Sequence, residues 1–172
     1  MMEVLQMKSN LIFIPAVVAL SLVGCGQQRT SPYSNHPPGS TDPVFKLAYA
    51  ELLKVQDVDG RAVGAAGVRG EFHMLFESIY EHGTEANFGA MAYHTNPVVR
   101  VMGLLALKYR NPTLAAVIAR HCDTDTTKVC VRDFGCMGFD EQYGDLAKNI
   151  IESEDFLDTR NLAHKIDAKR KR

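Results

Sequence analysis

Residues 96–118 read NPVVRVMGLLALKYRNPTLAAVI, and this stretch does most to decide the fold. It contains two Asn-Pro pairs, Asn96-Pro97 and Asn111-Pro112. Each pair is typical of a helix start, because Asn caps free backbone amides and Pro fits the first helical turn. Apolar residues follow both pairs at helical spacing. The two starts are 15 residues apart, so the sequence predicts two helices that are joined by a tight turn and packed as an antiparallel hairpin.

Further helices are predicted on both sides of this hairpin. Asp42-Pro43 is another capping residue followed by Pro, Gly83 is a natural helix end, and Thr84 can cap a short helix. The apolar periodicity places these helices at residues 42–57, 71–82, 85–93, 141–151 and 156–168.

Two stretches lack a helical period. Residues 128–136 alternate loosely between apolar and polar side chains, so a short extended segment is predicted there. Residues 58–70 (VDGRAVGAAGVRG) are rich in glycine but lack the GxxxxGK pattern of phosphate-binding loops. We therefore expect a flexible or closely packed connection at this point and no nucleotide site.

The hairpin resembles a known repeat. Residues 96–100 followed by residues 103–107 are similar to the second helix of a HEAT-type repeat, whose Val-Arg and Ala-Leu positions bury against the neighbouring hairpin. Residues 62–144 also resemble a group of exported bacterial proteins without an assigned activity. That group shares the Val-Gly-x-Ala-Gly segment at 63–67, the Asn-Pro-Val-Val-Arg helix, and a Gly-Cys pair at 135–136 after Lys-Val. Both resemblances imply architecture only, and the expected fold is all-α, a small bundle of HEAT-like helical hairpins.

The N-terminal residues have the composition of an export signal. Residues 11–23 (LIFIPAVVALSLV) are apolar throughout, but these 13 residues are too few to span a bilayer, which needs about 20. This length is typical of the hydrophobic region of a signal peptide, and Lys8 precedes it. Because Met7-Lys8 is a normal beginning for such a signal, Met7 is expected to be the true start in place of Met1.

Leu22-Val23-Gly24-Cys25 directly follows the apolar run and resembles the lipobox of bacterial lipoproteins. The resemblance implies a signal peptide over residues 1–24, cleavage before Cys25, and attachment of acyl chains such as palmitate to Cys25. Each buried methylene then adds about 0.8 kcal/mol to membrane binding. The alternative is a plain secretory signal followed by an incidental cysteine.

The lipobox also sets the expected location and the domain boundaries. Gly26 stands where an Asp would imply inner-membrane retention in enteric-type lipoproteins, so the bacterial outer membrane is favoured, on its periplasmic or surface face. Residues 25–41 are polar beyond the cysteine and are predicted to form a flexible tether. A helical domain over residues 42–168 and a basic tail over residues 169–172 follow.

The charge of the chain limits its partners. A formal net charge of −1 gives no electrostatic case for nucleic-acid binding, which calls for a basic face. The basic tail is expected to be a solvated, frayed end, with contact to anionic lipid or phosphate as the alternative.

Three cysteines remain for the folded part: Cys122, Cys130 and Cys136. In an oxidising exported compartment, one disulfide among them is predicted. Three pairings are possible, and a turn-rich connection gives Cys122 with Cys130 a weak preference. A zinc site that adds His121 is an alternative, but there is no CxxC pair, and adjacent His121 and Cys122 cannot easily bind one ion. No metal, cofactor or catalytic residue is therefore predicted.

The favoured function is a lipid-anchored envelope protein that acts as a helical protein-interaction module, with another envelope protein as its partner. This hypothesis predicts exposed apolar residues on a helical face. The first alternative is an enzyme or metal-binding protein, which requires that His121, Cys122, Cys130 and Cys136 converge on one pocket. The second alternative is a structural protein that maintains the envelope. Whether the chain is an enzyme is left open, with a non-enzyme favoured.

Overall fold

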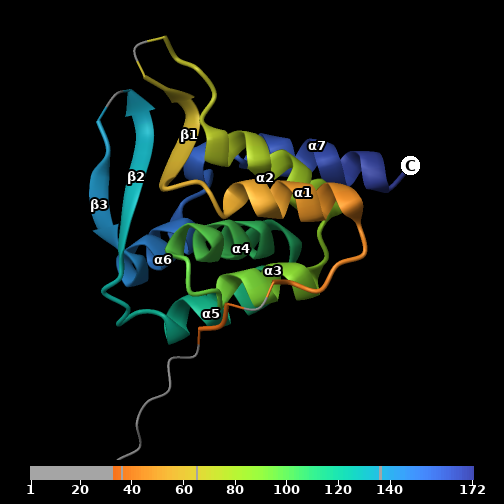
Figure 1. Cartoon of the computed structure of the whole chain (residues 1–172), viewed down its shortest axis with the longest axis horizontal. Coiled ribbons are helices and arrows are strands. Elements are labelled where there is room, and N and C mark those ends of the chain that lie inside the picture. Colours follow the sequence, from red (N-terminus) through yellow and green to blue (C-terminus); the bar gives the residue numbers. More distant parts are fainter. Residues whose placement is uncertain (1–32, 36, 65, 136) are drawn as a thin grey trace, which may run out of the picture. The chain divides into compact units, whose positions relative to one another are not determined.

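The computed structural model describes residues 33–35, 37–64, 66–135 and 137–172. This part of the chain contains seven α-helices, one short 3-10 helix (η1) and a three-stranded sheet (Figure 1). It is therefore mostly helical, and the all-α prediction is wrong in one respect, because it left out the sheet. None of the described helices combines the length and the apolar character that crossing a bilayer requires.

The elements follow one another without long connections. In chain order they are α1 (Pro43–Leu52), β1 (Asp57–Val63), α2 (Glu71–His82), α3 (Glu85–Ala92), α4 (Pro97–Arg110), α5 (Pro112–His121), β2 (Lys128–Gly135), β3 (Phe139–Gln142), α6 (Tyr143–Glu152), η1 (Phe156–Asp158) and α7 (Arg160–Arg170).

Helix α4 is the centre of the core. Its residues from Val98 to Leu107 are buried without interruption. A helix that is buried all round needs neighbours on every side, and α4 contacts α3, α5 and α6 as well as α2, β1 and β2. The Asn96 side chain accepts a hydrogen bond from the amide of Val98 at 2.9 Å, and the Asn111 side chain caps α5 in the same way. Both predicted Asn-Pro helix starts are confirmed.

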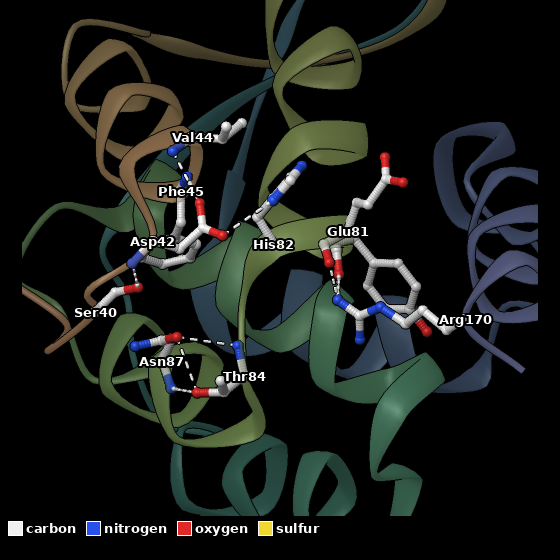
Figure 2. Close-up of polar contacts among 10 residues, drawn as sticks. Ser40, Asp42, Val44, Phe45, Glu81, His82, Thr84, Asn87 and Arg170 are labelled. Carbon is white, nitrogen blue, oxygen red and sulfur yellow. Dashed lines mark hydrogen bonds and ion pairs between the residues drawn. The ribbon is translucent and has the colours of Figure 1, made fainter.

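Polar caps lie at the starts of α1 and α3, and the cap of α1 also contacts the end of α2 (Figure 2). One carboxylate oxygen of Asp42 accepts hydrogen bonds from two backbone amides of α1, at 2.8 and 2.9 Å. The other oxygen lies 3.2 Å from Nδ1 of His82, in the last turn of α2. Thr84 and Asn87 form a reciprocal capping box at the start of α3. The predicted caps at Asp42 and Thr84 are confirmed.

The sheet has the order β1-β2-β3, with β1 parallel and β3 antiparallel to β2. Strand β2 confirms the extended segment predicted near residues 128–136. Strand β3 occupies residues 139–142, so α6 begins slightly later than predicted. Strand β1 falls largely within the predicted glycine-rich connection. Its sequence, DVDGRAV, has few residues that favour strands, and its pairing with β2 overrides this local preference.

The structure explains why glycine occupies three positions after β1. Gly64 and Gly67 adopt left-handed φ angles of 72° and 60° in the turn after the strand, which glycine tolerates best. At Gly70, a Cβ would collide with the carboxylate of Asp59. That carboxylate caps α2 by accepting hydrogen bonds from two of its first amides, at 3.0 and 2.8 Å. Gly70 is therefore closely packed against Asp59, whereas residues 64 and 66–69 of this connection are exposed.

Part of the predicted tether packs against the helices. The amide of Ser34 donates to the carbonyl of Tyr93 at 2.8 Å, and the amide of Thr95 donates to the carbonyl of Ser34 at 3.2 Å. These bonds fix the segment to the connection between α3 and α4. The packed domain therefore includes residues before Asp42, where the sequence placed its boundary.

Gly103 allows α3 and α4 to approach closely. A Cβ at this position would lie 2.5 Å from the backbone nitrogen of Ala92, so Gly103→Ala forces the two helices apart. We expect the free energy of unfolding to fall by about 2 kcal/mol in urea titrations. Gly89→Ala is the matched control, because a Cβ there meets nothing within 4 Å and should add about 0.5–1 kcal/mol. Equal stability of the two variants would contradict this packing.

Candidate functional site

Of the cysteines that the sequence singled out, the structure describes two, Cys122 and Cys130, and does not bring them together. Cys25 and Cys136 lie outside the described residues. Cys122 is buried at the end of α5, Cys130 is partly exposed in β2, and both thiols are free. The weakly favoured bridge between Cys122 and Cys130 is therefore not formed, and the pairings that use Cys136 stay predictions.

The surroundings of the two thiols disfavour thiolate chemistry. Burial raises the pKa of Cys122, and burial together with the neighbouring Asp57 raises the pKa of Cys130. Metal binding and nucleophilic attack both need the thiolate. In the described part of the chain, no group of three His, Cys, Asp or Glu side chains is placed to hold a metal ion. The ring of His121 instead lies 3.5 Å from the hydroxyl of Tyr93.

The environment of Cys122 leads to a different site, built around a buried cation. Arg100 lies within the buried run of α4, and only 1% of its side chain is exposed. Its guanidinium lies 4.0 Å from the ring centre of Tyr33 and 4.2 Å from that of Tyr143. It also forms an ion pair with Asp125 at 3.2 Å. We call Tyr33, Arg100, Cys122, Asp125 and Tyr143 the Arg100 cluster.

The cluster joins four separate parts of the fold. Tyr33 precedes α1, Arg100 belongs to α4, Cys122 and Asp125 follow α5, and Tyr143 begins α6. The Tyr33 hydroxyl donates a hydrogen bond to Asp125 at 2.5 Å and lies 3.8 Å from the sulfur of Cys122. Since a guanidinium keeps its charge in proteins, its burial requires the carboxylate and favours the two aromatic faces.

Each titratable group of the cluster is held in one protonation state near neutral pH. Burial alone would raise the pKa of Asp125, but hydrogen bonds from Thr127 and Tyr33 and the Arg100 charge together lower it. Asp125 is therefore ionised. Burial raises the pKa of both Tyr33 and Tyr143 well above the usual range, so both phenols stay protonated. Such a site is suited to holding the N-terminal segment in place and not to proton transfer.

The sequence pointed to only part of this cluster. The HEAT-type resemblance implies burial at Arg100, and the structure agrees. Its partners come from stretches that look like solvated connections: Tyr33 from the predicted tether and Asp125 from a polar turn. One available signal was a lone Arg inside a run that is otherwise apolar, because such a charge needs a carboxylate nearby.

Comparison of the chain with protein-family models, with curated proteins and with solved structures finds no match. A function therefore has to be argued from the chain's own sites.

Replacing Arg100 with Met should lower the free energy of unfolding by about 3 kcal/mol, because it leaves the Asp125 carboxylate largely buried and unpaired. Arg120→Met is the control, since Arg120 is exposed and donates to a carbonyl of its own helix; it should change stability by less than about 0.5 kcal/mol. Urea titrations followed by circular dichroism measure both. If Arg100→Met were as stable as the parent protein, the ion pair could not be what the cluster depends on.

The lowered pKa of Asp125 also predicts an acid dependence. A carboxyl whose pKa is lower in the folded than in the unfolded state stabilises the fold above its unfolded pKa, and this contribution disappears as pH falls through the folded value. We expect the loss to begin near about pH 4. Asp125→Asn should remove this part of the dependence, measured as unfolding midpoints between neutral and acidic pH. An unchanged acid dependence in the variant would refute the assignment.

Proposed function

We propose that the chain is a lipid-anchored protein of the bacterial envelope whose mostly helical domain binds another envelope component. The anchor rests on the lipobox-like residues 22–25 after an apolar run of signal-peptide length. The HEAT-like character of the α4–α5 hairpin agrees with a binding module, because stacked hairpins offer extended surfaces to partners.

The observation that favours this function most is the place of Tyr33 in the Arg100 cluster. Tyr33 follows Cys25 by eight residues, and eight extended residues span at most about 28 Å. A domain in which Tyr33 is packed would be held close to the bilayer that contains the acyl chains. A connection that stayed free as far as Asp42 would allow a much longer reach.

A binding surface is available on α1. The helix turns Phe45, Tyr49 and Leu52 into the core, but it also leaves Leu47 66% exposed and Val44 43% exposed. Apolar side chains gathered on an exposed helix face are typical of interaction surfaces. They support a protein partner, whereas the fixed protonation states of the Arg100 cluster and the protonated thiols give an enzyme no support.

Cys25→Ser tests the anchor. The parent protein should fractionate with membranes, and the variant should move to the soluble fraction, because no acyl chain can be attached to serine in the lipoprotein pathway. Cys130→Ser is the matched control: it removes a thiol from the folded domain and should leave the protein on the membrane. The measurement is immunoblotting of membrane and soluble fractions. Retention of Cys25→Ser on the membrane would refute lipid anchoring.

A further inference from the structure

A second site lies away from the Arg100 cluster. A hollow of about 690 Å³ opens between β1, the start of α2, η1 and α7. This volume is within the range of small-molecule sites. Its charged and polar lining includes Arg61, Arg69, His73, Asp158, Asn161 and Lys165. These residues come from two separate parts of the sequence, residues 61–73 and residues 158–165.

The charges around the hollow do not cancel. Arg61, Arg69 and Lys165 supply three cations, and Asp158 supplies the only carboxylate of the lining. Among the described residues, Arg61 and Lys165 form no ion pair, and Arg69 has only a long contact of 3.9 Å with Glu77. That pair is largely exposed and contributes little. The hollow therefore has a surplus of two positive charges that the protein leaves available.

His73 adds a buried imidazole to the same lining. The residue is 2% exposed, both ring nitrogens are buried, and the backbone carbonyl of Asp158 accepts a loose hydrogen bond from the ring. Burial, together with the charges of Arg69 and Arg61, lowers the pKa of His73. The ring is therefore neutral at neutral pH and leaves the positive charge of the hollow to the arginines and the lysine.

An uncommon backbone conformation in η1 leads into α7, which lines one side of the hollow. Leu157 and Asp158 are consecutive residues with left-handed φ angles of 57° and 56°, a conformation that costs energy in non-glycine residues. The chain then turns into α7, where Asn161 and Lys165 are four residues apart and share one helix face. Lys165 and Asn161 therefore line the hollow together with the two arginines, and Asn161 adds a neutral donor and acceptor.

We infer that this hollow binds a soluble phosphate monoester. A phosphate monoester carries close to two negative charges at neutral pH, which matches the surplus of two cations. Its oxygens can accept hydrogen bonds from the two arginines and the lysine at once, whereas a single carboxylate is satisfied by one arginine. The remaining volume and the polar groups of Asp158 and Asn161 suit a small hydroxylated body. The inference does not depend on the lipid anchor.

The hollow lies apart from Tyr33, the first described residue of the chain. Figure 1 shows α2 and α7 on one side of α4, and α3 and α5 on the other. The hollow belongs to the first side. Tyr33, through which the chain continues towards Cys25, contacts Arg100 of α4 and Cys122 at the end of α5. Tyr33 therefore packs away from the elements that line the hollow.

Calorimetric titration of the purified full chain with glycerol 3-phosphate tests the inference. We expect saturable binding with a stoichiometry of one at physiological salt. Acetate should bind at least about tenfold more weakly, because it has one charge and fewer acceptor oxygens. Vesicles that contain phosphatidic acid form a separate arm. Binding to the vesicles without binding to glycerol 3-phosphate would overturn the soluble ligand, and no saturable binding in either arm would overturn the site.

Paired variants separate this site from general electrostatic attraction. Arg61→Gln with Lys165→Gln should weaken glycerol 3-phosphate binding at least about tenfold, since it removes two charged donors. Arg120→Gln with Lys148→Gln is the matched control. It removes the same charge from a different hollow, between α5 and α6, and should leave the affinity unchanged. Unfolding midpoints confirm that each variant is folded. An equal loss in both pairs would overturn the inference, and so would full binding by the first pair.

Discussion

The structure depends on neutralising one cation in its core. Helix α4 is buried over ten consecutive residues, and one of these is Arg100. An unpaired charge in such a place would cost several kcal/mol, so the surrounding segments must supply a carboxylate and polarisable faces. Asp125 from the connection after α5 and Tyr143 from α6 do this within the helical body. Tyr33 completes the set from outside it, which makes the N-terminal segment a part of the fold.

The helices could be predicted where local chemistry determines them. Asp42, Thr84, Asn96 and Asn111 cap the helices that the sequence places after them, because a cap bonds to amides only two or three residues away. Strand β2 could also be predicted, since the alternation of its apolar and polar side chains is a local pattern. Strand β1 was not, because its sequence has weak strand preference and its partner lies far along the chain. Two parallel strands joined by a long crossover connection show no local sequence pattern that predicts their pairing.

The partners of Arg100 could not be predicted for a related reason. A single sequence shows that a buried arginine needs an acid, but it does not show which of the 20 acidic residues the fold brings to it. Polarity misled here, because Asp125 and the segment around Tyr33 have the composition of solvated connections. The glycine-rich residues 58–70 illustrate the converse. Glycines in such numbers suggest a flexible segment. In the structure they make room for the Asp59 cap and a tight turn. This arrangement places Arg61 and Arg69 beside α7.

Helix α4 separates the two proposed sites. The Arg100 cluster lies where α4 meets the end of α5 and the start of α6, and the phosphate hollow lies among β1, α2, η1 and α7. A fully buried helix with packed neighbours deforms little, so the distance between the two sites is fixed by the core and not by loops. A ligand in the hollow therefore need not disturb the packing of Tyr33 against Arg100, because no residue of the Arg100 cluster lines the hollow.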